Sequence, residues 1–414
     1  MPRMESVEAF LTLLDRSELL SREQMLGVSD VSNSLRTPQE LANWLVKQRW
    51  LTRWQATQLL EGHEQLRVGK YRLLNLIGRG GMGLVFLAET TTTNANAATV
   101  LRPSGSGSRG ERLEPLADGH STDSPLASEI SSNETLSNGL VALKIMTSLG
   151  NPKGLKRYLQ EVEAASALDH PHIVKTLDSG VADGCHFLVM EFLPGRDLNA
   201  IMRDQSPLPV SWSCAVIRQT ALGLQYAHEQ GLVHRDIKPH NILVTPEPDF
   251  LTPHARILDF GLAHIAAQSN SLRDVTQTGA VLGTADYIAP EQAMSAKHAD
   301  IRSDIFGLGC TLFQLITGEL PFQGNNVMEK LMARITTIPP SVSALRAEAH
   351  SDLDDLVANM LRTNPNDRPQ TPAEIASELD RLSLKIRRHE LRIGKLSPRK
   401  LSPHAQSRSR LRRS

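Results

Sequence analysis

The stretch His234-Arg235-Asp236-Ile237-Lys238-Pro239-His240-Asn241 decides the fold of this chain. It places a carboxylate, an ammonium group and a carboxamide within one short loop. Together these groups can orient a hydroxyl, neutralise a moving phosphoryl group and hold a metal ion. The stretch therefore points to phosphoryl-transfer chemistry, and the rest of the chain must supply the nucleotide site that such chemistry needs.

The composition is that of an ordinary soluble globular protein, with 40% hydrophobic and 22% charged residues. The 414 residues can hold two or three compact units. Cys185, Cys214 and Cys310 form no C-x-x-C pair, so neither a zinc site nor a disulfide framework is indicated. No apolar run approaches the roughly 20 residues of a membrane span, and no signal peptide opens the chain. We therefore expect a cytoplasmic protein with no membrane span.

Charge is balanced overall but not locally. Lys+Arg and Asp+Glu both total 45, yet residues 385–414 hold 11 basic side chains and only Glu390 as an acid. Ser397-Pro398 and Ser402-Pro403 favour an extended chain here, so we predict a basic, disordered tail over 385–414. Binding of this tail to an acidic partner or to nucleic acid is the alternative.

Residues 1–66 have the pattern of a small helical module. The pair Thr52-x-x-Gln55 is one of its helix-start signals, because Thr and Gln at this spacing form a capping box. Large aromatic side chains at helical spacing usually form a core, and a docking face for a partner is the alternative. The module holds three of them: Trp44, Trp50 and Trp54.

A glycine-rich turn follows the module. Tyr71–Ile77 is a predicted strand, Val85–Ala88 is a second one, and the residues around the turn are Ile77, Gly78, Arg79, Gly80, Gly81, Met82, Gly83, Leu84 and Val85. Glycines there let backbone N–H groups approach phosphate oxygens closely. A dinucleotide-binding unit would continue into a helix, so the second strand argues against that alternative.

Residues 90–139 are rich in Thr, Ser, Gly and Asn and contain no aromatic residue, which predicts a disordered insertion. Order returns at the apolar strand Leu140–Lys144. A predicted helix then offers two acids, Glu161 and Glu163, either of which could meet Lys144.

Two further tripeptides complete the series: Asp259-Phe260-Gly261 and Ala289-Pro290-Glu291. With the His234–Asn241 loop, the glycine turn and the Lys144 strand, they follow the order of the protein-kinase motifs. The chain resembles the eukaryotic-like (Hanks-type) serine/threonine protein kinases of bacteria over 71–382, the insertion excepted. The helices ending in Leu51-Thr-Arg-Trp-Gln-Ala56 also look like a module that precedes such domains in planctomycete bacteria.

The resemblance implies an α+β, bilobal protein kinase fold. A small antiparallel sheet with one helix would form the amino lobe, a mainly helical part the carboxyl lobe, and ATP would bind between them. Asp236 would be the catalytic base, Lys238 would contact the γ-phosphate, and Asn241 and Asp259 would hold Mg²⁺. The family's spacing selects Glu161 over Glu163 as the partner of Lys144.

The resemblance also assigns the adenine site. Its residues would be Val85, Ala142 and Leu243 around the base, Met190 as the gatekeeper, and the backbones of Glu191 and Leu193 at the adenine edge. Asp304 would brace the catalytic loop, and Arg368 would pair with Glu291.

Three functions compete on these residues. The first is an active protein kinase, which would take Ser/Thr-containing protein substrates and could self-associate for autophosphorylation at Thr276 and Thr278. A catalytically dead scaffold would lack a catalytic or metal-binding residue, and none is missing. A small-molecule phosphotransferase would not need the segment that ends in Ala289-Pro290-Glu291. Lys238 and Thr284 match the serine/threonine pattern rather than the tyrosine pattern.

Overall fold

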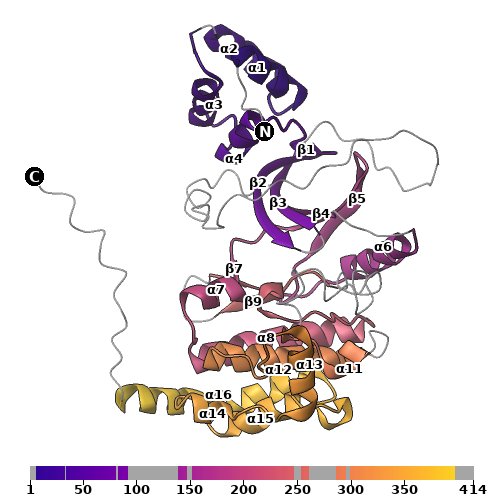
Figure 1. The fold of residues 1–414 in the computed structure, drawn as a ribbon, viewed down its shortest axis with the longest axis vertical. Coiled ribbons are helices and arrows are strands. Elements are labelled where there is room, and N and C mark those ends of the chain that lie inside the picture. Colours follow the sequence, from indigo (N-terminus) through magenta and orange to yellow (C-terminus); the bar gives the residue numbers. More distant parts are fainter. Residues whose placement is uncertain are drawn as a thin grey trace, which may run out of the picture. The chain divides into compact units, whose positions relative to one another are not determined.

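The computed structural model describes residues 6–32, 34–80, 83–91, 139–146, 152–246, 253–260, 286–294 and 299–396. The chain forms two compact units (Figure 1). The amino-terminal unit comprises residues 1–168 and 174–194, and the carboxyl-terminal unit comprises residues 169–173 and 195–414. Most of the predicted insertion, the segment 261–285 and the end of the tail lie outside the described residues.

The amino-terminal unit begins with four helices and continues into an antiparallel sheet. Its helices are α1 (Val7–Arg16), α2 (Arg22–Ser32), α3 (Pro38–Lys47), α4 (Arg53–Leu60) and, later in the chain, α6 (Pro152–Ser166). Its strands are β1 (Arg67–Val68), β2 (Tyr71–Gly80), β3 (Gly83–Thr90), β4 (Leu140–Met146), β5 (Thr176–Ala182) and β6 (Cys185–Glu191). Among the described residues the strand order is β1-β2-β3-β4-β6-β5.

The insertion does not prevent its flanking strands from pairing. β3 and β4 pair antiparallel in unbroken register from Gly83↔Met146 to Glu89↔Leu140. The amide of Thr90 donates to the carbonyl of Gly139 at 3.1 Å, so the two ends of the insertion are adjacent. This agrees with the low entropic cost of closing a long surface loop.

The helical module has its own core. Phe10, Leu14, Leu41 and Leu45 are fully buried in it, and Trp44 and Trp50 pack against it with their rings 5.2 Å apart. Trp54 differs, because it packs against both this core and the core of the sheet. The predicted core role therefore holds within the module for two tryptophans, whereas the third joins the module to the sheet.

The carboxyl-terminal unit is mainly helical. Its elements are β7 (Arg196–Asp197), α7 (Leu198–Asp204), α8 (Val210–Glu229), η1 (Pro239–Asn241), β8 (Ile242–Thr245), β9 (His254–Ile257), α11 (Pro290–Met294), α12 (Ile301–Thr317), α13 (Val327–Thr336), α14 (Val342–Leu345), α15 (Asp352–Met360), η5 (Pro365–Asp367) and α16 (Pro372–Leu396). Helix α12 is almost entirely buried, as expected of a central core helix. Asp300 caps its start, and Gly318, in the left-handed conformation, ends it. Helix α8 packs against both α12 and α16.

The expectation of a disordered tail over 385–414 is wrong for residues 385–396. Helix α16 continues to Leu396, and Ile386 within this part is 1% exposed. The Glu390 carboxylate accepts hydrogen bonds from the amides of Val210 at 2.9 Å and Ser211 at 3.4 Å. It thereby caps α8, whose own N-cap residue is a proline without a side-chain acceptor. Residues 397–414 lie outside the described part.

Within the described residues, no helix is both long and apolar enough to cross a membrane.

Candidate active site

A buried carboxylate fixes the start of the catalytic loop. Asp304 on α12 is 1% exposed and accepts hydrogen bonds from the backbone amides of His234 at 2.8 Å and Arg235 at 2.6 Å. Burial raises the pKa of Asp304 to about 6, although His234, Arg235 and the two amides favour the anion. Arg235 has a φ of 65°, an unfavourable value for a residue with a Cβ. The carboxylate therefore holds the loop in a strained turn just before Asp236.

The imidazole of His234 connects two parts of the site. Its Nε2 lies 2.8 Å from the carbonyl oxygen of Leu258, which can only accept, so Nε2 carries the proton. Its Nδ1 then accepts from the amide of Asp236 at 3.2 Å. The ring also packs edge-on against Phe260, with the centroids 4.9 Å apart. His234 thus joins the backbone of Asp236 to the segment that leads to Asp259.

The side chains of the predicted catalytic loop converge on one carboxylate. The Lys238 ammonium lies 2.8 Å from Oδ2 of Asp236. The Asn241 amide nitrogen donates to the same Oδ2 at 3.0 Å and to the carbonyl oxygen of Asp236 at 2.7 Å. These two donors set the direction of the carboxylate, and the structure brings together the three loop residues that the sequence singled out.

The two candidate metal ligands lie at the same end of a hairpin. Asn241 directly precedes β8, and Asp259 follows β9 by two residues. The amide of Leu258 donates to the carbonyl of Asn241 at 2.9 Å, which closes this end of the hairpin. Because the Asn241 amide nitrogen is turned toward Asp236, its oxygen faces away from that residue. An amide oxygen and a carboxylate are hard oxygen ligands of the kind Mg²⁺ takes, so these residues fit the ion.

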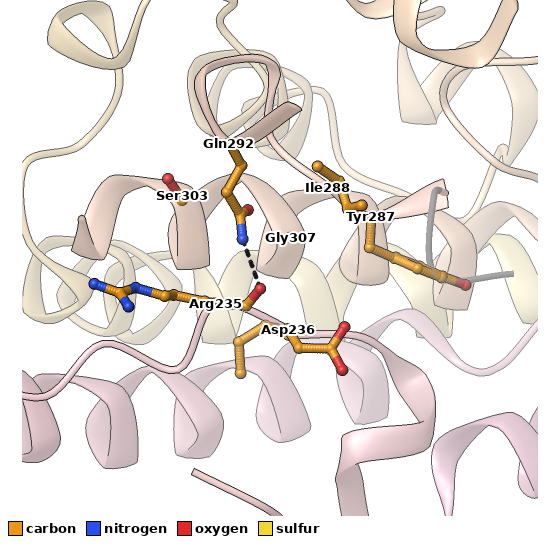
Figure 2. A pocket seen from close by; sticks show the side chains of 8 residues that line it. Arg235, Asp236, Tyr287, Ile288, Gln292, Ser303 and Gly307 are labelled. Carbon is orange, nitrogen blue, oxygen red and sulfur yellow. Dashed lines mark hydrogen bonds between the residues drawn. The ribbon is translucent and has the colours of Figure 1, made fainter. Parts of the chain in front are cut away.

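The sequence analysis missed Gln292, on α11. Its amide nitrogen donates to the carbonyl oxygen of Arg235 at 2.7 Å. Figure 2 shows this bond across a small pocket lined by Arg235, Asp236, Ile237, Tyr287, Ile288, Gln292, Ser303 and Gly307. Asp304 and Gln292 therefore hold the two sides of the same backbone turn. Only the position of Gln292 directly after Ala289-Pro290-Glu291 could have indicated it.

In the amino-terminal unit, the predicted nucleotide residues share one face of the sheet. Val85 lies opposite Lys144 in the β3–β4 pairing, and Ala142 lies opposite Met190 in the β4–β6 pairing. Cross-strand partners point to the same side, and alternate residues on β4 do so too. Val85 and Ala142 are half-buried, whereas Lys144 is 7% exposed. The neighbouring residues, including Phe86, point to the opposite face and form the core of the sheet.

The predicted glycine turn is a hairpin between β2 and β3, with Gly80 paired to Gly83. A Cβ on Gly83 would lie 2.0 Å from the carbonyl oxygen of Ile145, so strand packing alone requires glycine there. A Cβ on Gly78 would only touch Val85 at an ordinary distance of 3.4 Å. Packing within the protein therefore does not explain why position 78 is a glycine. Ile77 and Arg79 are exposed and Leu84 is half-buried, while Gly81 and Met82 lie outside the described residues.

Three further predicted residues lie in the same unit. On α6, Glu161 is half-buried and Glu163 is exposed, which fits the choice of Glu161. The amide of Glu191 donates to the carbonyl of Lys175 at 3.0 Å, so contact of Glu191 with adenine would use its carbonyl oxygen. Leu193 is half-buried, as is Leu243 on β8 in the other unit. Thr276, Thr278 and Thr284 lie outside the described residues.

Comparison with known proteins decides the family. The profile of the family described as "Protein kinase domain" matches residues 128–379. The chain belongs to the protein kinase family. The chain is 32% identical to "Serine/threonine-protein kinase pkn3" of Myxococcus xanthus, over 77% of its own length and 51% of that protein. It is 35% identical to "Serine/threonine-protein kinase PknB" of Mycobacterium leprae over 58% of its own chain and 38% of that protein. The relatives are therefore of the bacterial Hanks type.

Solved structures agree with this family. The kinase domain of Mycobacterium tuberculosis PknI matches with a TM-score of 0.52 and 24% identity, over 76% of this chain and 97% of that one. A double mutant of the same domain matches with a TM-score of 0.53. The expected α+β protein kinase fold is confirmed. The kinase spans about half of the pkn3 relative and less of PknB.

A buried ion pair anchors the segment that carries Gln292. The Arg368 guanidinium, whose side chain is fully buried, binds both carboxylate oxygens of Glu291 at 2.8 Å. Burial opposes ionisation of Glu291, but Arg368 and Ser303 outweigh that effect and lower its pKa. Arg368 also donates to the carbonyls of Arg302, Arg362 and Thr363. The pairing that the resemblance implied is therefore present.

Replacing Arg368 by Met should destabilise the carboxyl-terminal unit by about 3–5 kcal/mol, because the Glu291 charge would stay buried without its partner. Urea unfolding of the full chain measures this. In the wild type, the ion pair contributes its full stabilisation at pH values above the ordinary pKa of glutamate. This stabilisation is lost as the pH falls through the lowered pKa of Glu291. In the variant the deficit should shrink on acidification, because protonation removes the unpaired charge.

Arg381→Met is the matched control, because Arg381 pairs with Glu378 at the surface with 56% of its side chain exposed. Solvent and salt screen such an exposed pair, so its loss should change the free energy of unfolding little. Equal losses in the two variants would contradict the role given to burial, and the double variant Glu291→Gln/Arg368→Met should recover part of the loss.

Proposed function

We propose that this protein is a serine/threonine protein kinase, which transfers the γ-phosphate of ATP to Ser or Thr hydroxyls of proteins. The observation that carries the proposal is the convergence of Lys238 and Asn241 on the Asp236 carboxylate. A base, a cation and a metal-binding amide within one loop are the parts that phosphoryl transfer requires. The names of the relatives pkn3 and PknB support the same substrate class.

Asp236 acts as the catalytic base. Its carboxylate accepts the proton of the substrate hydroxyl and orients that oxygen toward the phosphorus. Lys238 shares this carboxylate and places its ammonium where negative charge develops on the transferred group. Little covalent chemistry is asked of the protein, so the fixed direction of Asp236 matters more than a shifted proton affinity.

Asn241 and Asp259 would hold Mg²⁺ through an amide oxygen and a carboxylate. When bound, the ion would neutralise the phosphate oxygens of ATP and help to align them. In the amino-terminal unit, Lys144 would bind the α- and β-phosphates, with Glu161 orienting its ammonium. The glycine hairpin from Ile77 to Val85 would cover the phosphates.

The adenine would lie against the sheet face that carries Val85, Ala142 and Met190. This face is half-buried at Val85 and Ala142, so apolar surface is available for a base. Leu243 would contact the other side of the ring, and the backbones of Glu191 and Leu193 would bind its edge.

The substrates, partners and origin of this protein are inferred from its family and its sequence. The protein would act on Ser/Thr-containing proteins in the cytoplasm, and two copies could meet for autophosphorylation. The helical module resembles one that precedes kinase domains in planctomycetes, and we infer an origin of that kind. A role for the basic tail in binding nucleic acid has no support beyond its charge.

Lys144→Met and Asp259→Asn should each lower Mg²⁺- and ATP-dependent phosphorylation of a generic protein substrate by about 100-fold or more, because each removes a charge that positions or neutralises the phosphates. Transfer of ³²P from ATP, followed by phosphoamino-acid analysis, measures rate and acceptor together. Near-wild-type turnover in both variants, or phosphate on tyrosine, would rule out the proposal.

Activation would run through autophosphorylation at Thr276 and Thr278. A phosphate there carries about −1.5 to −2 charge and could bind the Arg235 guanidinium, which directly precedes Asp236. Replacing both threonines by Ala should lower turnover on a protein substrate and leave ATP affinity nearly unchanged. Phosphate mapping by mass spectrometry, with Asp236→Asn as the inactive control, tests this. Full turnover in the double variant, with both threonines empty in active enzyme, would refute the mechanism.

A further inference from the structure

The start of α4 carries two side chains that each make a second hydrogen bond outside the helix. Thr52 and Gln55 form a capping box. The Thr52 hydroxyl accepts a hydrogen bond from the backbone amide of Gln55 at 3.1 Å, and the side-chain carbonyl oxygen of Gln55 accepts one from the backbone amide of Thr52 at 2.8 Å. The Thr52 hydroxyl also donates to the carbonyl of Leu74 at 2.6 Å, and the Gln55 amide nitrogen donates to the carbonyl of Leu73 at 2.7 Å. We call these two bonds to β2 the α4 clamp.

The clamp holds β2 at an irregular point. Leu73 pairs with Ala88 and Asn75 pairs with Leu87, so the register between β2 and β3 shifts within the segment that the clamp binds. A shift of this kind leaves backbone groups without a partner in the sheet. Gln55 is 1% exposed, so water does not replace the bond that it makes. The clamp therefore satisfies two backbone carbonyls of the irregular strand, and the bond from Gln55 to Leu73 does so in a buried environment.

Two further contacts join the helical module to the sheet. The Trp54 ring lies 5.6 Å from the Phe86 ring, on the sheet face opposite to Val85 and Lys144. On the other side of the module, Arg72 of β2 donates to the carbonyl of Leu19 at 3.0 Å. The module thus contacts β2 at two places and β3 at a third.

We propose that Thr52 and Gln55 are positioning residues for the nucleotide. β2 continues from the clamp to Gly80, and Leu74 is four residues before Gly78. A strand held at this point carries the glycine hairpin in a set direction, so the module belongs to the nucleotide-binding machinery. This inference rests on the proposed role of the glycine hairpin in binding ATP.

Two substitutions of similar size, Thr52→Asp and Gln55→Glu, remove the hydrogen bonds of the α4 clamp and keep the helix cap. Thr52→Asp keeps a good N-cap residue, and Gln55→Glu still completes a capping box. Neither carboxylate can donate a hydrogen bond to a strand carbonyl. In the full chain, Thr52→Asp/Gln55→Glu should raise the Kd for Mg-ADP by about fivefold to tenfold, the change expected for losing one or two hydrogen bonds. Isothermal titration measures both the Kd and the fraction of binding-competent protein.

The control repeats the same chemistry elsewhere in the module. Ser21 and Gln24 form an equivalent reciprocal cap on α2 at the surface, so Ser21→Asp/Gln24→Glu should bind Mg-ADP like the wild type. Thr52→Ser, which keeps both hydrogen bonds of the hydroxyl, should also bind like the wild type. In Gln55→Glu alone, the affinity relative to wild type should recover as the pH falls from 8 to 5.5, because a protonated carboxyl can donate again.

If the clamp only stabilised the fold, Thr52→Asp/Gln55→Glu would lower the binding-competent fraction of the protein without changing the Kd for Mg-ADP. That result would overturn the proposal. An unchanged Kd in folded Thr52→Asp/Gln55→Glu would overturn it as well. Should the double variant not fold, Thr52→Asp alone decides by the same criteria. Lys144→Met separates the positioning role of the clamp from the kinase assignment. If Lys144→Met abolishes phosphoryl transfer while the clamp variants bind Mg-ADP normally, the positioning role is wrong and the kinase assignment stands.

Discussion

The pair of hydrogen bonds from His234 and Arg235 to the buried Asp304 carboxylate is the interaction on which the catalytic loop depends. A carboxylate in a dry environment is costly unless its oxygens are satisfied, and here the backbone itself supplies the donors. The strained conformation at Arg235 persists because relaxing it would break these hydrogen bonds to the buried carboxylate. The direction of Asp236, the next residue, follows from that turn.

The other loop contacts build on this anchor. Gln292 binds the carbonyl of Arg235, His234 binds the amide of Asp236, and Asn241 binds its carbonyl and side chain. Three of these contacts bind backbone atoms of Arg235 and Asp236, and the fourth binds the Asp236 carboxylate. In the amino-terminal unit, the alternation of side chains along each strand places Val85, Ala142 and Lys144 on one face of the sheet and the core residues on the other. Trp54 of α4 packs against the core face.

The sequence predicted those parts of the site whose residues are close together in the chain. The loop 234–241, the glycine hairpin and the Lys144 strand are local patterns, and the Thr52–Gln55 cap follows from a spacing of three. Two contacts between distant residues, Asp304 with the loop and Arg368 with Glu291, were expected only from the family resemblance. Other distant contacts were missed, because no local pattern encodes them. Glu390 caps α8 across 180 positions, and Gln292 reaches Arg235 across 57. The length of α16 was missed for the same reason, since its docking on α8 outweighs the basic composition that predicted a disordered tail.

The most direct test of this account is hydrogen exchange at the amides of His234 and Arg235, measured together with turnover, in Asp304→Asn. Both amides should lose protection, and turnover should fall on the order of 100-fold, since a small misplacement of a catalytic group can cost that much. Mg-ADP affinity should stay within about twofold, because that change removes no nucleotide contact. Wild-type protection with wild-type turnover would contradict the claim that Asp304 sets the geometry of the catalytic loop.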